Sequence, residues 1–486
     1  MEDAFSGIMD LRRDSAEPLH IQMAEQIKQA VIAGRLKPET RLPPSRVLAG
    51  QLGVSRNTVL AAIEQLKSEG ILETKPGSGT RIASFDDPDL ARANPNTVRT
   101  HPVHHLASRW HGTLKAAGTR PVYMQKPFQP GIPDLTSLPA EIWGTCLRRA
   151  ARLLDTETSG YRHATGHPRL RRILAGYLAD ARGVRAEPEQ IFVTSSARAG
   201  ISLIVSALLE PGADCWIEEP GFRSARTIFG AGGANLIPVP VDSMGIDPSR
   251  APDDSQPRLV YTTPSHQYPT GALMALARRI ALIETVSKRG GYIIEDDFDS
   301  EFQYSGRPIA ALQGLDQAEC VLYLGTFSKS LLPALRVGFV VVPPGLADAF
   351  TEVLTYTGHL VSPIVQLALA DFIERGHYRA HLRRMKALYA ERLEMFAEGI
   401  ERHSGGVLKM VKPDGGLQTV VSAAYGAIPE LELWRKLYDA GVYSQPLSWF
   451  HVEPEHATCH GLLMSFASWP ERETKDAFKR LSALFR

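Results

Sequence analysis

The sequence has few cysteines, no long hydrophobic run and almost no net charge. The four cysteines are scattered over 486 residues and fit neither a disulfide framework nor a CxxC metal site: Cys146, Cys215, Cys320 and Cys459. The N-terminus, MEDAFSGIMDLRRDS, carries charges where a signal peptide needs an apolar run, and no segment reaches transmembrane length. The 54 Lys and Arg against 53 Asp and Glu exclude a uniformly basic coat. We therefore expect a reduced, cytoplasmic chain of two or three domains with no membrane partner.

A short N-terminal segment carries a charge of its own. Residues 11–82 hold eleven Lys or Arg and seven Asp or Glu, a net of 11 − 7 = +4 in a chain whose total is +1. Apolar residues recur at helical spacing between Pro18 and Gly34, which predicts a first helix. A second helix is expected after RLKPETRLPPS, with Ser45 as its cap and Val47 on its buried side.

A turn and a third helix follow this pair. Gly53 supplies the turn, Ser55 caps the third helix, and the segment ILETKPGSGTRI predicts a hairpin with a Gly-rich tip. The exposed start of the third helix reads SRNT, which gives short polar donors and one fork-shaped cation suited to base edges and phosphates. The order of elements predicts a winged helix-turn-helix over residues 11–83, although a basic helical face is by itself more often a solvated surface.

Residues 42–80, LPPSRVLAGQLGVSRNTVLAAIEQLKSEGILETKPGSGT, closely resemble the winged helix-turn-helix of GntR-type bacterial transcription regulators without a gap. The resemblance implies a double-stranded DNA operator as partner. It also implies the residues that contact DNA, on the helices and at the wing: Arg46, Ser55, Arg56, Asn57, Thr58, Lys75 and Gly77.

Between Ser84 and about Pro121 the helical periodicity lapses into a segment rich in Asp, Asn, Pro and Arg. Such a stretch is long for a connection inside one domain, so we expect an interdomain linker over residues 84–120. The linker histidines lack a carboxylate or cysteine partner at useful spacing, and we expect no metal site there: His101, His104, His105 and His111.

The remaining residues, 121–486, alternate strands and helices. Apolar runs rich in β-branched residues occupy residues 191–195, 215–220, 259–264, 292–297, 321–326 and 337–343. Such runs, separated by helical stretches, predict an α/β domain with a mostly parallel sheet buried on both faces. Polar residues gather where these strands end, which is where parallel sheets bind ligands.

Two residues at these strand ends suggest covalent chemistry. The stretch GTFSKSLLPALRVGF places Lys329 among hydroxyl side chains with Arg336 seven residues later, and hydroxyls with an Arg fork suit a phosphate beside a reactive amine. Asp296 ends a buried strand, where a carboxylate is costly to desolvate without a cationic partner. Asp297 and Asp299 are alternatives for that role, and an exposed Lys in a polar turn is the simpler explanation of Lys329 alone.

The order of strand, Asp296 and, 33 residues later, Lys329 is similar to that of the fold-type I, aspartate-aminotransferase-like enzymes. That resemblance implies pyridoxal 5′-phosphate as cofactor, an internal aldimine at Lys329 and a pyridine partner in Asp296. It also implies the remaining cofactor contacts: Phe222 on the ring, Ser196 and Ala197 at a helix start, Tyr268 in the YPTG loop, Ser328 and Arg336 on the phosphate, and Tyr161 at a neighbouring subunit's phosphate.

The winged helix and the aminotransferase-like domain together resemble the MocR subfamily of GntR regulators over essentially the whole chain. The resemblance implies a homodimer with exchanged helix-turn-helix heads, associated with the nucleoid when bound to DNA. It implies control of amino-compound or vitamin B6 metabolism, with pyridoxal phosphate or an amino compound sensed at Lys329.

Two positions depart from the aminotransferase pattern. Phe298 stands where relatives commonly carry a Tyr that hydrogen-bonds the cofactor, and Tyr268 is a candidate to compensate. Leu463, in LLMSFA, stands where aminotransferases anchor the substrate carboxylate with an Arg, and no Lys or Arg occurs in residues 437–471. Losing that partner costs several kcal/mol of carboxylate binding.

The departure at Leu463 favours a regulator over an enzyme, with residual cofactor half-reactions left open. The alternatives are an active aminotransferase that carries a DNA-binding module, and a domain that has lost its cofactor and only dimerises. An effector carboxylate would then need another cation, and the sequence offers three candidates: Arg162, Arg223 and Arg226.

Overall fold

The computed structural model describes residues 9–15, 17–75, 79–84, 107, 109–110, 127–154, 160, 163–305, 310–358, 361–424 and 428–485. The chain divides into two compact units, Met1–His105 and Leu106–Arg486, and each is described by itself. The predicted linker, residues 84–120, lies almost entirely outside the described residues, so the predicted domain boundaries stay predictions. No described helix is both long and apolar enough to cross a membrane.

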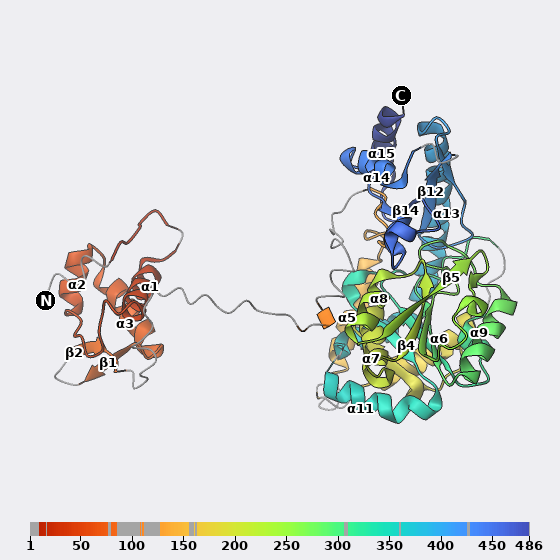
Figure 1. The fold of residues 1–486 in the computed structure, drawn as a ribbon. Coiled ribbons are helices and arrows are strands. Elements are labelled where there is room, and N and C mark those ends of the chain that lie inside the picture. The colour runs from red at the N-terminus through yellow and green to blue at the C-terminus, as the bar shows by residue number, and fades with distance from the viewer. Residues whose placement is uncertain are drawn as a thin grey trace. The chain divides into compact units, whose positions relative to one another are not determined.

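The described part of the N-terminal unit contains three helices and an antiparallel hairpin (Figure 1): α1 Leu19–Ile32, α2 Ser45–Leu52, α3 Arg56–Ser68, β1 Leu72–Lys75 and β2 Gly79–Ile82. Its core is built from apolar residues that recur on the inner faces of the helices, among them Met23, Ile27, Leu48, Val59 and Leu66. Ser55 caps α3 by accepting a hydrogen bond from the Thr58 amide at 3.0 Å. The predicted winged helix-turn-helix is therefore confirmed.

Two details of the second helix were predicted wrongly. Ser45 is the first residue of α2, which follows Pro44 without a side-chain cap, because the proline already fixes the backbone at the helix start. Val47 is 42% exposed, whereas Leu48 is fully buried. Helix α2 spans only Ser45–Leu52, so a shift of one residue in its start turns Val47 from the core to the surface.

The second unit is organised around an eight-stranded sheet in the order β3-β10-β9-β8-β7-β4-β5-β6. The strands are β3 Ile191–Thr194, β4 Asp214–Glu219, β5 Asn235–Asp242, β6 Gly245–Ile246, β7 Pro257–Thr262, β8 Tyr292–Asp297, β9 Val321–Thr326 and β10 Gly338–Val341. Strand β10 runs antiparallel to β3 and β9, and β6 runs antiparallel to β5. The other pairs are parallel, so the predicted mostly parallel sheet is confirmed.

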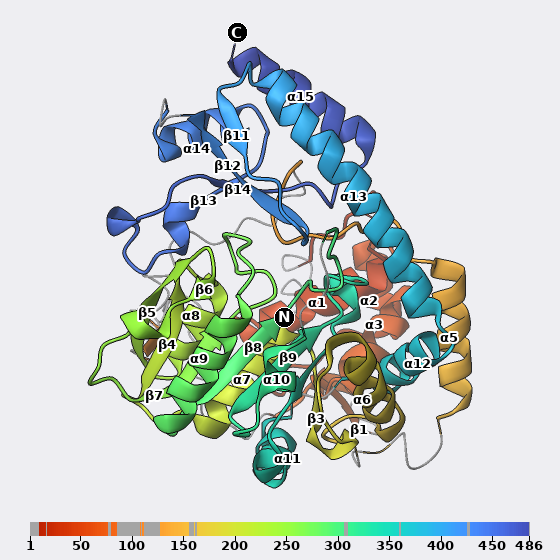
Figure 2. The same ribbon diagram turned by 90° about the vertical axis from the view of Figure 1, so that its right-hand side faces the viewer.

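Helices cover both faces of this sheet (Figure 2). One face packs against α7 Ala197–Leu208, α8 Arg223–Ala231 and α11 Ala347–Thr357. The other face packs against α5 Ala140–Arg152, α6 Pro168–Arg182, α9 Leu276–Lys288, α10 Leu312–Leu315 and α12 Pro363–Glu374. Successive strand residues alternate between the faces: Ile293 lies in the α9 cluster and Ile294 in the α7 cluster.

The C-terminal part adds a four-stranded antiparallel sheet in the order β11-β12-β14-β13, beside the long helix α13 (Figure 2). Its elements are β11 Leu408–Met410, β12 Gln418–Ala423, β13 Gln445–Pro446, β14 Leu462–Ser465, α13 His377–His403, α14 Glu430–Asp439 and α15 Glu471–Leu484. Short 3-10 turns join elements of the whole unit: η2 Pro188–Gln190, η3 Pro248–Arg250, η4 Pro333–Leu335, η5 Pro344–Leu346, η7 Leu447–Phe450 and η8 Pro454–His456.

The carboxyl ends of the parallel strands meet at one edge of the large sheet. Strands β4, β7, β8 and β9 end there, and these strand ends and the loops that follow carry Glu218, Thr263, Asp296 and Lys329. Helix α7 begins at the same edge, because β3 runs parallel to β9 through β10. The sequence thus brings its polar strand ends together in space.

Candidate functional site

Asp296 is a buried carboxylate with one free oxygen. It lies at the end of β8 and is 4% exposed. Tyr261 of β7 donates its hydroxyl to Oδ2 at 2.5 Å, whereas Oδ1 has no hydrogen-bond partner among the described residues. Burial raises the pKa of Asp296 to about 7, although the hydrogen bond from Tyr261 opposes the rise. This oxygen can accept a hydrogen bond from a cationic group, such as the N–H of a protonated ring.

The two alternative carboxylates already have cationic or basic partners. Asp297 accepts hydrogen bonds from Arg182 Nε at 2.7 Å and from the Tyr323 hydroxyl at 2.6 Å. Burial opposes ionisation of Asp297, but Arg182 and Tyr323 hold its pKa below the ordinary value. Asp299 contacts His266 Nδ1 at 2.8 Å. Among the three, Asp296 is therefore the carboxylate without a cation, even though Asp297 also keeps one oxygen without a hydrogen bond.

Lys329 follows β9 in a partly buried loop. Its Nζ donates a hydrogen bond to the backbone carbonyl of Gly131. Burial, together with the Arg198 cation, lowers the pKa of Lys329 to about 8, against the opposing charges of Asp299 and Asp296. A lysine whose pKa lies close to neutrality has a larger fraction of neutral amine, the form that attacks an aldehyde.

A cradle of hydroxyl and amide groups lies beside Lys329. The Thr326 hydroxyl donates to Ser328 Oγ at 3.0 Å, and Ser196 caps helix α7 by accepting from the Ala199 amide at 3.2 Å. The register of β10 sets Gly338 opposite both Thr326 and Thr194, which brings the loops after β9 and β3 together. The first amides of a twelve-residue helix such as α7 attract anions.

Gly338 permits this close approach. A Cβ at this position would lie 2.9 Å from the carbonyl carbon of Ser196 and 3.1 Å from the amide nitrogen of Ala197. Real Cβ atoms do not approach backbone so closely, so a larger residue would push the start of α7 away. The structure thus brings the start of α7, at Ser196 and Ala197, close to Gly338, which pairs with Thr326 at the end of β9.

Arg336 supplies a cation in the loop between β9 and β10. It adopts a left-handed conformation, with φ 52° and ψ 51°, and its side chain is exposed. Among the residues that the structure describes, the Arg336 guanidinium has no hydrogen-bond or ion-pair partner, and only the backbone amide is bonded, to the Pro333 carbonyl. Left-handed backbone is strained for a residue with a side chain, and such strain concentrates at functional loops. The guanidinium is available to an anion.

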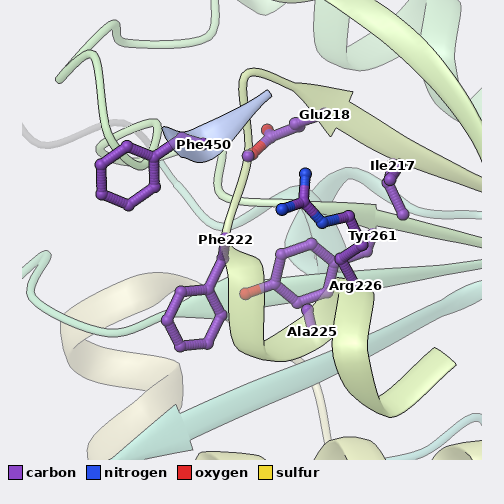
Figure 3. Close-up of a pocket in the computed structure, with 8 residues that line it drawn as sticks. Ile217, Glu218, Phe222, Ala225, Arg226, Tyr261 and Phe450 are labelled. Carbon is purple, nitrogen blue, oxygen red and sulfur yellow. The ribbon is translucent and has the colours of Figure 1, made fainter. Parts of the chain in front are cut away.

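Aromatic rings line the α8 side of the site (Figure 3). Phe222 stacks on Tyr261 with centroids 6.5 Å apart and an interplanar angle of 24°, and Tyr268 meets Phe222 edge-on at 5.4 Å. Phe298 touches Tyr268 at 5.9 Å. Figure 3 shows the rings of Phe222 and Tyr261 side by side, with Phe450 across a small cavity. Phe222 and Tyr268 therefore lie next to the carboxylate that Tyr261 holds.

The position of the missing carboxylate anchor is apolar. Leu463 lies on β14, is fully buried, and packs with Leu447 and Phe450. Tyr268 and Val420 pack against the same cluster. A carboxylate placed there would lose its hydration without gaining a charged partner.

Of the candidate replacement cations, Arg226 donates from Nη1 to the backbone carbonyl of His451 at 2.5 Å, which orients its guanidinium. Arg223 is partly buried, and burial lowers its pKa while Tyr268 and Tyr443 oppose that change. Arg223 therefore lies near Tyr268 and Tyr443. Arg162, like the predicted cofactor residue Tyr161, lies outside the described residues.

The predicted DNA contacts lie on the surface of the N-terminal unit. Arg46, Ser55, Arg56 and Asn57 are exposed, and Thr58 is partly buried beneath the Ser55 cap. Arg56 Nε donates to the Ser45 hydroxyl at 3.4 Å, so the two helices of the motif share a polar contact.

At the wing, Lys75 is exposed and pairs with Glu73 at 3.0 Å. Gly77 lies outside the described residues. The predicted wing contacts are thus only partly located by the structure.

Sequence reasoning did not find four residues of the site. Tyr261 lies in an apolar strand, which predicts a core residue, and Gly131 is distant in sequence from the other site residues. Arg198 acts through its charge on Lys329, and Gly338 acts by allowing the start of α7 to approach. A signal existed for Gly338, because a glycine opening an otherwise β-branched strand marks close backbone approach. Tyr261 and Gly131 carry no such signal, since only the fold brings them to Asp296 and Lys329.

The chain is similar to two groups of known sequences. The family described as "Aminotransferase class I and II" matches residues 140–481, and "Bacterial regulatory proteins, gntR family" matches residues 20–82. The "Probable rhizopine catabolism regulatory protein MocR" of Rhizobium meliloti is 39% identical over 98% of this chain and 95% of that protein. The "HTH-type pyridoxine biosynthesis transcriptional regulator PdxR" of Corynebacterium glutamicum is 35% identical over 83% of this chain and 84% of that protein.

Solved structures give the same fold. The kynurenine aminotransferase of Pyrococcus horikoshii, in complex with PMP, matches with a TM-score of 0.67 and 25% identity over 78% of this chain and 95% of its own. LysN of Thermus thermophilus, an α-aminoadipate aminotransferase complexed with N-(5′-phosphopyridoxyl)-L-leucine, matches with a TM-score of 0.66 and 24% identity over 78% of this chain and 94% of its own. These matches confirm the predicted fold class and pyridoxal 5′-phosphate as the cofactor.

Proposed function

We propose that this chain, which belongs to the MocR subfamily of GntR-type regulators, controls transcription according to the compound that is bound at Lys329. Its relatives are named as transcription regulators, including one of rhizopine catabolism and one of pyridoxine biosynthesis. By that analogy the controlled genes serve amino-compound or vitamin B6 metabolism. The signal is pyridoxal phosphate itself or an amine that competes with Lys329 for it.

The observation that carries the proposal is the free oxygen of Asp296 on the same side of the sheet as Phe222. When bound, pyridoxal phosphate supplies an aldehyde that condenses with amines. Asp296 Oδ1 would hold the protonated ring nitrogen, and Phe222 would lie against the ring. Ser196, Ala197, Ser328 and Arg336 would bind the phosphate, as their hydroxyl, amide and guanidinium donors fit an anion.

A covalent attachment at Lys329 is tested by borohydride reduction of the purified protein, followed by peptide mass spectrometry. The expected result is a cofactor adduct on Lys329 that Lys329→Ala lacks. Lys288→Ala, which changes an exposed lysine on α9, is the matched control and should keep the adduct. A protein that carries no adduct would support instead a domain that only dimerises.

The DNA-reading part of the proposal rests on the capped start of α3. Arg56 and Asn57 are exposed there, and Ser55 fixes the first turn that presents them. In a mobility-shift assay with the protein's own promoter region, Arg56→Ala should weaken binding by about tenfold or more, since one base or phosphate contact contributes about 1–3 kcal/mol. Arg35→Ala, an exposed arginine beyond α1, should bind as the wild type does.

The second candidate function, an active aminotransferase, is disfavoured by Leu463. Its buried apolar surroundings offer no cation to an α-carboxylate. Leu463→Arg should raise the affinity for amino acids, measured by the change of the cofactor's absorbance on adding each one. Rapid transamination by the wild type, without sequence-specific DNA binding, would overturn the regulator proposal.

An effector carboxylate would instead be bound by Arg223, which lies near Tyr268 and Tyr443. Arg223→Gln should therefore reduce the spectral response to carboxylate-bearing amines while leaving the response to simple amines unaffected.

The proposed assembly is a homodimer whose helix-turn-helix heads are exchanged between partners. Sedimentation of the holoprotein at several concentrations measures the mass, and a monomer at all of them would contradict that assembly.

A further inference from the structure

The side chains of Cys459, His451 and Glu219 form a chain of thiol, imidazole and carboxylate contacts. His451 Nε2 lies 3.3 Å from Cys459 Sγ, and His451 Nδ1 lies 3.1 Å from Glu219 Oε1. Glu219 is fixed by the Val452 amide, which donates to the same oxygen at 2.8 Å. A base within hydrogen-bond reach of a nucleophile, and itself oriented by a third group, is the geometry of activated nucleophiles.

The surroundings favour a charged imidazole. His451 is 2% exposed, and burial alone would keep it neutral. The hydrogen bonds to Cys459 and Glu219 nevertheless raise the pKa of His451 to about 9. The charged groups that face this histidine are Glu219 from β4 and Arg226 from α8, whose guanidinium binds the His451 backbone carbonyl. The contact between His451 Nε2 and Cys459 Sγ gives the thiol proton a base to move to, and proton transfer would form the nucleophilic thiolate.

A cavity makes the sulfur reachable. Cys459 lines a hollow of about 520 Å³ together with Thr458, Val420 and Gln418. Cys459 is partly exposed, whereas the three other cysteines are buried: Cys146, Cys215 and Cys320. Burial raises the pKa of the Cys146 thiol to about 11 and those of Cys215 and Cys320 to about 12. Buried protonated thiols of that kind are inert, so they serve as internal controls.

We propose that Cys459, with His451 and Glu219, is a modification site at which small hydroperoxides oxidise the thiol to a sulfenic acid. The thiolate sulfur attacks one peroxide oxygen, an S–O bond forms, and the O–O bond breaks. Sulfur loses two electrons and the peroxide gains them. The released oxygen takes the proton held by His451 and leaves as water or an alcohol. No step involves Lys329 or the cofactor, so the proposal stands apart from the proposed function.

The test uses the full-length holoprotein with hydrogen peroxide, followed by dimedone and mass spectrometry of all four cysteine peptides. We expect dimedone on Cys459 and none on Cys146, Cys215 or Cys320. An ordinary thiol, with a pKa of about 8.5, reacts about tenfold more slowly for each pH unit below that value. With the thiol proton transferred to His451, as the proposal requires, the Cys459 rate should instead be nearly constant between about pH 6.5 and about pH 8.5.

Two variants separate activation from mere exposure. His451→Asn and Glu219→Gln should restore the steep pH dependence of an ordinary thiol and slow the reaction near neutral pH by about tenfold or more. Neither substitution changes Cys459 itself, so the partial exposure of its thiol alone predicts no loss of rate. A wild-type rate that already rises about tenfold per pH unit would overturn the proposal without any variant. Equal neutral-pH rates in wild type and both variants would overturn it as well.

Discussion

Asp296→Asn is expected to stabilise the cofactor-free protein at alkaline pH while weakening its hold on the cofactor. The pKa of Asp296 is about 7, against an ordinary 3.8. The difference of about 3 units is equivalent to about 4 kcal/mol at about 1.36 kcal/mol per unit. Because the folded-state pKa is raised, the favourable contribution of the neutral carboxyl is complete below pH 3.8 and is lost as pH rises through about 7.

Urea unfolding of the cofactor-free protein at two pH values measures this loss. From about pH 5.5 to about pH 8 the wild type should lose about 2 kcal/mol more than Asp296→Asn, because roughly half of the penalty is already present at the lower pH. The new amide leaves a buried group without a partner, which costs about 1–3 kcal/mol at both pH values and cancels in the comparison. All six tryptophans lie in the unit Leu106–Arg486, so their fluorescence follows that unit alone.

Asp297→Asn, one residue along the same strand, is the matched control with the opposite sign. Arg182 holds the pKa of Asp297 below its ordinary value, so this carboxylate stabilises the fold throughout the same pH range. Removing this carboxylate leaves the Arg182 cation buried without its counter-ion, which should cost about 3–5 kcal/mol at both pH values. If Asp296→Asn and the wild type lose stability in parallel, Asp296 does not carry the buried charge. Cofactor affinity of Asp296→Asn at about pH 8 should fall by about a hundredfold.

Three further predictions test single contacts. Tyr261→Phe removes the hydrogen bond that opposes the raised pKa of Asp296, so cofactor affinity at about pH 7 should fall about tenfold in an absorbance titration. Gly338→Ala places a Cβ 2.9 Å from backbone, so inorganic phosphate should compete less well with the cofactor than in Gly345→Ala, where a Cβ meets nothing. Ser55→Ala removes the α3 cap and should cost the N-terminal unit about 1 kcal/mol in circular-dichroism melts.

Local patterns in the sequence predicted most of the fold, because hydrophobic period and caps report backbone conformation directly. The capped helix at Ser55, the hairpin and the six apolar strands all appear where these signals lie. In α2, Ser45 is not the cap because Pro44 fixes the backbone at the helix start, and Val47 was misplaced because a helix of eight residues gives too few turns to fix its phase. Strand β5 was harder to recognise, since its prolines at 238 and 240 weaken the strand signal.

The candidate site was predictable only where its residues share a motif. Lys329, Ser328 and Asp296 follow strands whose carboxyl ends meet by topology, so the sequence could group them. Tyr261 and Gly131 reach the site from other segments, and nothing in their local sequence marks them. For the same reason the link between Cys459, His451 and Glu219 was invisible, since 459 − 219 = 240 positions separate the first from the last.

The buried carboxylates at this sheet edge differ in how the chain itself satisfies them. Glu218 accepts hydrogen bonds from two threonines and from Gln267 on both oxygens, and Glu295 accepts the Leu312 and Gln313 amides. Asp297 and Asp299 have Arg182 and His266. Asp296 has one tyrosine hydroxyl and a free oxygen. Among these described carboxylates, Asp296 therefore best fits the proposed role of holding the cation of a ligand, because it has the fewest partners within the chain.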